Sequence, residues 1–310
     1  MSETAEKLVE PARAAPPAPP RPRRWTRDAV ETAVFGVLRR VVIALLVLVT
    51  VFPFLYMVVL SLRSLDEVLQ QPGVLWPTDL DLSTYASVLA PVSAGGQGFL
   101  GFLANSAVIA VLTVLVTLAA AIPGAYAISR LAFRGRRQVS ALFLAVYLFP
   151  AILLAVPLFV FFSAIGLRGS LFGLLVVYVA QTVPISIYML RNYFDTVPVS
   201  LEEAAALDGA SRTQIILRVS LPLAMPAVVS NGLYVFMIAW NEFLFALLFL
   251  AEDRPRWTVS LGLSQLAGSI EIPTTVLMAG SVLITIPIVV IFFFTERLLV
   301  EGLTSGAEKG

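Results

Sequence analysis

Residues 200–222 read SLEEAAALDGASRTQIILRVSLP, a short polar stretch between two long apolar runs. Ser200 and Glu203 have the Ser-x-x-Glu spacing of a capping box, which predicts a helix that begins at Leu201. Gly209 stands where a helix end needs a left-handed residue, and glycine adopts that conformation at little steric cost. The first half of the stretch therefore predicts a short capped helix followed by a sharp turn.

The second half of the stretch repeats the pattern. Ser211 and Gln214 have the spacing of another capping box, and Pro222 is expected to end the helix that they start. Between the two caps, the alanines at positions 204–206 form a small-residue surface that lets the backbone of another protein come close. We therefore expect a stiff, small-faced bend that docks a partner.

The composition excludes a soluble protein and most catalytic chemistry. Apolar residues make up 58% of the 310 residues and charged residues 13%, where a soluble domain has about a quarter charged. Cysteine and histidine are absent, which removes thiol nucleophiles, disulfides, Cys/His zinc sites and His-based triads. We therefore predict no catalytic, metal or cofactor-binding residues in this chain.

Lysine occurs only at Lys7 and Lys309, near the two ends of the chain. A phosphate-binding loop of the Gly-x-x-x-x-Gly-Lys-Ser/Thr type needs a lysine, so none lies in the body of the chain. If the protein uses nucleotide energy, a different subunit must bind the nucleotide.

Residues 1–27 are rich in proline and arginine and are predicted to be a disordered tail, because this composition cannot bury a core. Residues 28–40 fit either an amphipathic lead-in helix or a simple extension of the first membrane span. Residues 28–310 are expected to form one membrane domain.

Six apolar stretches are long enough to cross a membrane, which takes about 20 residues per helix. The sequence thus predicts an all-α integral membrane protein with six transmembrane helices. Several of them contain proline, which neighbouring helices or water can accommodate. The predicted spans are Val41–Leu62, Ala107–Ile128, Val139–Phe161, Leu171–Leu190, Ala227–Phe249 and Thr275–Leu298.

The basic residues predict the orientation of these helices. Of the 21 lysines and arginines, only Arg63, Arg168, Arg254 and Arg256 fall in the loops after the first, third and fifth spans. Cytoplasmic loops carry the excess of Lys and Arg, so both termini are expected in the cytoplasm. The polar stretch at 200–222 then lies on the cytoplasmic side.

The full spacing from Glu203-Ala204-Ala205 through Asp208-Gly209 to Leu221-Pro222 resembles the coupling loop of membrane-spanning subunits of bacterial ABC importers. The resemblance covers roughly residues 35–310 and implies a type I importer permease fold, with a coupling loop at 199–223. In that family the first loop helix docks in a groove on a cytoplasmic ATPase. An interfacial helix is the alternative, but such helices favour basic and aromatic residues rather than alanine and acidic ones.

Two further stretches narrow the resemblance to carbohydrate importers. Residues 239–243, Ala-Trp-Asn-Glu-Phe, look like the same position in sugar permeases, and the tail at 299–310 is similar to that of the maltose-type second permease. In that family the tail reaches between the ATPase subunits, and its matching residues here are Gly302, Leu303, Thr304, Ser305 and Gly306.

The resemblance implies a multi-pass permease subunit in the bacterial inner (plasma) membrane that is not itself an enzyme. Its implied partners are a second permease subunit as a heterodimer, two ATPase subunits that bind ATP and Mg, an extracytoplasmic sugar-binding protein and membrane lipid, with no nucleic acid. The implied substrate is a di- or oligosaccharide such as trehalose or maltose.

Polar side chains at membrane depth are costly and usually face a bundle interior or a water-filled cavity. Positions 231, 234, 238, 241 and 245 follow steps of three and four residues and are expected to share one helical face. Amides, carboxylates and aromatic rings suit a hydroxyl-rich ligand, although such residues also join helix to helix. The candidate pathway residues are Asn231, Tyr234, Asn241, Glu242 and Gln181.

Three other functions stay open at this point: an ABC importer permease for a non-sugar solute, a stand-alone secondary transporter, and a membrane scaffold without transport activity. Secondary transporters often show internal repeats and several ionisable residues near the midplane. Glu242 is the only acidic residue well inside a predicted span, and no inverted repeat is evident.

Overall fold

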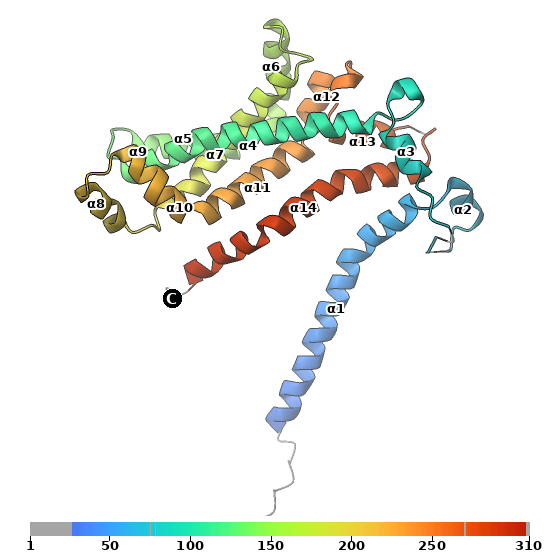
Figure 1. The fold of residues 1–310 in the computed structure, drawn as a ribbon, viewed down its shortest axis with the longest axis horizontal. Helices are drawn as coiled ribbons and strands as arrows, with labels where there is room; N and C mark the ends of the chain where they lie inside the picture. Colours follow the sequence, from blue (N-terminus) through green and yellow to red (C-terminus); the bar gives the residue numbers. More distant parts are fainter. Residues whose placement is uncertain (1–26, 75, 78, 270, 308–310) are drawn as a thin grey trace, which may run out of the picture. The chain divides into compact units, whose positions relative to one another are not determined.

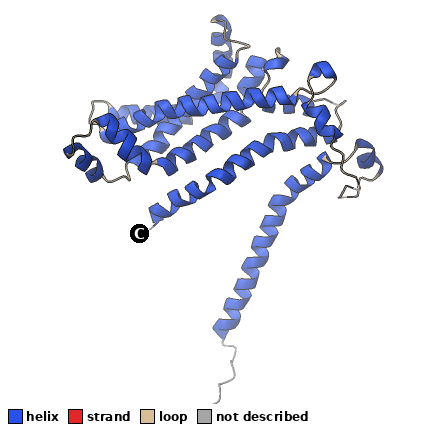
Figure 2. Cartoon of the chain, in the orientation of Figure 1, coloured by secondary structure: helices blue, strands red, loops and turns tan. Residues whose placement is uncertain are grey.

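The computed structural model describes residues 27–74, 76–77, 79–269 and 271–307. Within these ranges every regular element is a helix and no strand occurs (Figure 2). The chain divides into two compact units, Met1–Pro53 and Phe54–Gly310, and each is described by itself.

The first unit contains most of helix α1 (Arg27–Ser61), which continues across the unit boundary. Residues 28–40 and the first predicted span up to Ser61 belong to this one helix, as expected of an extension of the span. Apolar side chains along it, such as Val34 and Leu48, are exposed within the described chain. The length and apolarity of Val34–Ser61 suit a membrane crossing.

The second unit is built on four long helices that lie side by side: α4 (Phe99–Arg130), α7 (Leu171–Phe194), α11 (Met225–Asn241) and α14 (Thr274–Ala307) (Figure 1). Helix α4 packs most extensively on α7 and then on α11, and α11 also packs on α14. Small buried residues of α4, such as Ala121 and Ala125, allow this close approach. The bundle positions the short helices at both ends of this unit.

The third predicted span is not one continuous helix. Helices α5 (Arg136–Leu148) and α6 (Ala151–Ala164) meet at a bend of 91°. Pro150 lacks a backbone N–H, and a residue before proline is driven out of the helical region, so Phe149 is extended (φ −75°, ψ 124°). The predicted span Val139–Phe161 is thus divided into two helices at Pro150, one of the prolines that the sequence places in it.

The fifth predicted span, Ala227–Phe249, is also interrupted. Helix α11 ends at Asn241, Glu242 is extended (φ −63°, ψ 131°), and the short helix α12 (Leu244–Leu250) follows. By length and composition, four described helices can cross a membrane. The number rises to six if each of two bent helix pairs counts as one span, namely Arg136–Leu148 with Ala151–Ala164 and Arg212–Leu223 with Met225–Asn241.

Short helices cover the two ends of the bundle (Figure 1). At the end where α4 begins lie α3 (Ser83–Leu89), η1 (Val92–Ala94), η3 (Arg254–Arg256) and α13 (Val259–Ala267), with α2 (Leu65–Gln70) close to α3 in the sequence. At the end where α4 finishes lie α8 (Val199–Leu207), α9 (Arg212–Ile215), η2 (Ile216–Ser220) and α10 (Leu221–Leu223). The polar stretch thus occupies one end of the bundle.

Candidate functional site

Helix α8 begins earlier than its sequence pattern indicates. It starts at Val199, after Pro198, and no side chain caps it. Pro198 already has the extended conformation of an N-cap (φ −60°, ψ 125°), so Ser200 falls inside the first turn and cannot cap. The predicted capping box of Ser200 and Glu203, and the predicted start at Leu201, were wrong.

The turn after α8 forms as predicted. Gly209 has φ +87°, the left-handed conformation that favours glycine. Its N–H donates to the carbonyl of Ala206 (3.1 Å), and the N–H of Ala210 donates to that of Ala205 (3.0 Å). These bonds satisfy carbonyls at the helix end and reverse the chain within three residues.

The second capping box is confirmed. The Ser211 hydroxyl accepts from the Gln214 N–H (3.4 Å), and the Gln214 side chain accepts from the Ser211 N–H (2.8 Å). The expectation that Pro222 ends this helix was wrong, because the helical structure continues through Pro222 to Leu223. The π-helical turn η2 already breaks the α-helical pattern, and Pro222 sits in the first turn of α10, where no N–H is needed.

The outer side of α8 is exposed and consists largely of small side chains. The side chain of Leu207 is 90% exposed, and Ala204 and Ala206 are exposed beside it. The carboxylates of Glu203 and Asp208 border this surface. A hollow of 370 Å³ continues it across the turn and is lined by Ala205, Asp208, Gly209, Ala210, Gln214, Arg218 and Val219.

The inner side of α8 carries a residue that sequence reasoning missed. Glu202 is only 7% exposed, and its carboxylate lies 3.0 Å from the Arg130 guanidinium at the end of α4. The two residues are 72 positions apart in the chain, so no local spacing connects them. The only signal was the pair of adjacent glutamates, because neighbouring residues of a helix point about 100° apart and can have different surroundings.

Two of the five candidate pathway residues line a cavity. Gln181 on α7 and Tyr234 on α11 face a space of 640 Å³ that is otherwise mostly apolar and also contains Tyr147 and Thr182. The Nε2 atom of Gln181 is buried and has no hydrogen-bond partner among the described residues.

The other three candidates do not line this cavity. Asn231 is fully buried; its Nδ2 lies 3.5 Å from the Met189 sulfur and its Oδ1 has no partner in the described chain. Asn241 is exposed and donates to the Met237 carbonyl (2.9 Å). The single face expected over positions 231–245 ends at Asn241, because Phe245 belongs to α12.

Glu242 holds the break between α11 and α12. Its carboxylate accepts a hydrogen bond from the Tyr178 hydroxyl of α7 (2.6 Å) and from the backbone N–H groups of Phe245 (2.8 Å) and Ala246 (3.1 Å). A carboxylate at a helix N-terminus satisfies otherwise unpaired N–H groups. The side chain of Glu242 is thus engaged with its own chain.

The expected C-terminal contact residues fall at the edge of what the structure describes. The backbone of residues 302–306 continues helix α14, while the exposure and contacts of Gly302, Leu303, Thr304, Ser305 and Gly306 lie outside the described part.

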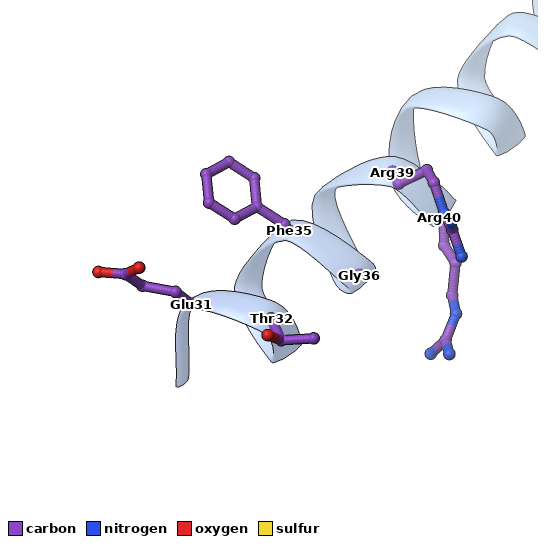
Figure 3. A pocket seen from close by; sticks show the side chains of 6 residues that line it. All are labelled: Glu31, Thr32, Phe35, Gly36, Arg39 and Arg40. Carbon is purple, nitrogen blue, oxygen red and sulfur yellow. The ribbon is translucent and has the colours of Figure 1, made fainter. Parts of the chain in front are cut away.

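A further hollow lies along α1 beside Phe35 and Arg39 (Figure 3). All of its lining residues come from that one helix, so it does not form an enclosed site.

Comparison with known proteins relates the chain to transport proteins. The family described as "Binding-protein-dependent transport system inner membrane component" matches residues 118–304, which include the whole stretch from α8 to α10. The chain is 38% identical over 86% of its length to the inner membrane ABC transporter permease protein YcjP of Escherichia coli, covering 94% of that protein.

A second relative carries a substrate in its name. It is the trehalose/maltose transport system permease protein MalG of Thermococcus litoralis, 38% identical over 86% of this chain and 94% of that protein. Among solved structures, a bacterial ABC transporter involved in the import of the acidic polysaccharide alginate matches with a TM-score of 0.74 and 27% identity. That match covers 88% of this chain and 98% of the other.

Proposed function

We propose that this chain, which belongs to the family of binding-protein-dependent transport system inner membrane components, is a permease subunit of an ATP-driven sugar importer. It is a multi-pass protein of the inner membrane. The observation that carries the proposal is the exposed, small-faced helix α8 at one end of the bundle, turned by Gly209 into a second capped helix within the family match.

In this proposal α8 docks on a cytoplasmic ATPase, which binds ATP and Mg while this chain binds neither. The exposed alanines allow close backbone approach, and the protruding Leu207 supplies apolar area to bury. The proposed coupling residues are Glu203, Ala204, Ala205, Asp208, Gly209, Leu221 and Pro222. Residues 302–306 are proposed to contact the ATPase as well.

The proposed topology has six spans and both termini in the cytoplasm. In this topology α5 with α6 makes the third crossing, α11 with α12 makes the fifth, and the loop from α8 to α10 lies on the same side as the termini. The remaining proposed partners are a second permease that completes the pathway, a second ATPase subunit and an extracytoplasmic binding protein that delivers the sugar; the family and the alginate-importing relative support them.

The proposed pathway passes the cavity beside α7 and α11. Gln181 offers an unpartnered amide N–H group and Tyr234 an aromatic face, the two kinds of group that bind a sugar hydroxyl and the apolar side of a sugar ring. Asn231, Asn241 and Glu242 are proposed as further pathway residues. For Glu242 the proposal requires that the bond to Tyr178 open during transport.

The substrate is proposed to be a di- or oligosaccharide such as trehalose or maltose. The named relative from Thermococcus litoralis and the tail and span-five stretches support this choice. A non-sugar solute is the alternative outcome of the test below.

The test has two arms. The tagged chain is purified from its native cells, and co-purification of an ATPase is expected for the parent chain but not for Ala204→Trp, which fills the small surface. Leu80→Trp, at an exposed position in the loop before α3, is the matched control. Uptake is then measured over trehalose, maltose, maltotriose, glucose and methionine.

Loss of ATPase co-purification with Ala204→Trp alone, and uptake of trehalose or maltose, are the expected results. Co-purification that is unaffected by Ala204→Trp would contradict the docking surface. Uptake of methionine without any sugar would contradict the substrate class.

A further inference from the structure

The two adjacent glutamates of α8 face opposite surroundings. Glu203 is exposed on the side proposed to meet the ATPase, whereas Glu202 is buried against the bundle. A buried carboxylate is costly unless it is paired and hydrogen-bonded, so its partners show what the residue does.

Three side chains from two separate regions bind the Glu202 carboxylate. Arg130 donates from Nε to Oε1 (3.0 Å), and the Tyr126 hydroxyl donates to Oε2 (3.0 Å); both residues belong to α4. The Ser220 hydroxyl donates to Oε1 (2.9 Å) from the last residue of η2. One side chain of α8 therefore ties the first half of the loop to its second half and both halves to α4.

Arg130 is also bound in more than one direction. Besides Glu202 it donates to the Val197 carbonyl (2.7 Å), in the segment that leads into α8, and to the Ser129 hydroxyl (3.2 Å). Ser129 in turn donates to Asp195 (2.5 Å). The end of α4 is thus fixed to both the entry and the body of α8.

These contacts give α8 a stiff connection to the helices that line the cavity. Helix α4 packs on α7 and α11, which carry Gln181 and Tyr234, and the Tyr126 ring meets the Phe194 ring of α7 edge-on at 6.0 Å. If α8 is displaced, the contacts of Glu202 therefore require α4 to move with it. Coupling between sites requires such a chain of packed and bonded groups.

We propose that the Glu202–Arg130 pair, secured by Tyr126 and Ser220, is the positioning contact that makes α8 and α4 move as one body when the ATPase closes. The proposal rests on the proposed function, because it requires an ATPase that moves α8. Glu202 acts through α4 and has no role in contacting the ATPase or the sugar.

The test measures whether α8 and α4 stay at a fixed distance. The chain contains no cysteine, so spin labels can be placed on Val199→Cys in α8, outside the proposed docking residues, and on Val116→Cys in α4, both exposed positions. The complex with its ATPase and second permease is reconstituted in nanodiscs. The label-to-label distance is recorded by pulsed electron resonance without nucleotide and after trapping with ATP and vanadate.

In the parent complex a single narrow distance is expected in both states. With Glu202→Gln or Arg130→Gln, the ATPase still co-purifies, but the distance changes on trapping because α8 follows the ATPase and α4 lags. Glu252→Gln is the matched control, since Glu252 pairs with Arg168 in an exposed ion pair (2.6 Å). This variant is expected to keep the parent distance in both states.

A merely structural role would lower the yield of complex without creating a nucleotide-dependent distance. If Glu202→Gln prevents assembly, the milder double variant Tyr126→Phe with Ser220→Ala, which keeps the ion pair, decides and is expected to shift in the same direction. A distance that stays unchanged on trapping in the variants that assemble would overturn the proposal. Failure of the parent chain to co-purify with any ATPase would instead overturn the proposed function.

Discussion

The loop from α8 to α10 and the bundle interior beside α7 and α11 differ in how some of their buried polar side chains are hydrogen-bonded. In the loop, the Glu202 carboxylate accepts hydrogen bonds from three side chains. In the interior, Gln181 Nε2 and Asn231 Oδ1 are buried without a hydrogen-bond partner among the described residues. The Glu202 carboxylate is therefore held by its own chain, whereas the two interior amides have hydrogen-bonding capacity that no described residue uses.

The largest effect is expected where the loop's polar network is broken. Glu202→Ala leaves the nearly buried Arg130 without its counter-ion, which should lower the free energy of unfolding by about 3 kcal/mol. Thermal unfolding in detergent measures the loss. Glu203→Ala, at the exposed neighbour, is the matched control and should change the free energy by less than about 0.5 kcal/mol.

Equal losses for Glu202→Ala and Glu203→Ala would remove the distinction between the inner and outer sides of α8. It would also mean that the carboxylate of Glu202 is solvated rather than tied to α4.

A smaller loss is expected at the turn between the loop's two halves. Gly209→Ala forces a Cβ into a backbone with φ +87°, which should cost about 1–2 kcal/mol. Apart from the adjoining residues, no atom of the described chain lies within 4 Å of such a Cβ, so the strain comes from the backbone alone. Gly101→Ala, in α4 with equally open surroundings, is the control and should be neutral or slightly stabilising. A neutral Gly209→Ala would contradict the strained turn.

In the bundle interior the sign of the effect should reverse. Gln181→Met keeps the side-chain length but removes the unpartnered amide, so the free energy of unfolding should stay equal or rise by up to about 1 kcal/mol. Uptake of the transported sugar should fall, because the amide is proposed to bind it. Loss of stability together with unchanged uptake would show that Gln181 serves helix packing instead.

The smallest effect is expected at the exposed capping box. Ser211→Ala removes the hydroxyl that accepts from the Gln214 N–H and should lower the free energy of unfolding by about 0.5 kcal/mol. Ser211→Asp retains a capping acceptor and should restore the parent value. A loss as large as that of Glu202→Ala would mean that the cap, rather than the buried network, holds the loop together.

Local spacing predicted the features of the loop that depend on neighbouring residues. The left-handed turn at Gly209 and the box of Ser211 and Gln214 form because their partners lie within five residues. The box at Ser200 failed for an equally local reason, since Pro198 provided the helix start first.

Features set by distant residues could not be predicted in this way. The bond from Arg130 to Glu202 and the bond from Tyr178 to Glu242 join helices that only the fold brings together. The bend at Pro150 is of the same kind, because proline allows a straight, kinked or broken helix and the packing of α5 on α7 selects among them. Sequence therefore predicted the helices of the bundle better than their breaks and cross-links.

The central claim is that the outer side of α8 meets an ATPase, and a crosslink from that surface tests it directly. A photoreactive phenylalanine analogue is placed at Leu207, whose side chain is 90% exposed, and in a second variant at Leu80, which is exposed in the loop before α3. After irradiation of intact cells, the crosslinked proteins are identified by mass spectrometry. The account predicts a nucleotide-binding ATPase at position 207 and none at position 80. Recovery of lipid alone at position 207, or of the same ATPase at both positions, would contradict it.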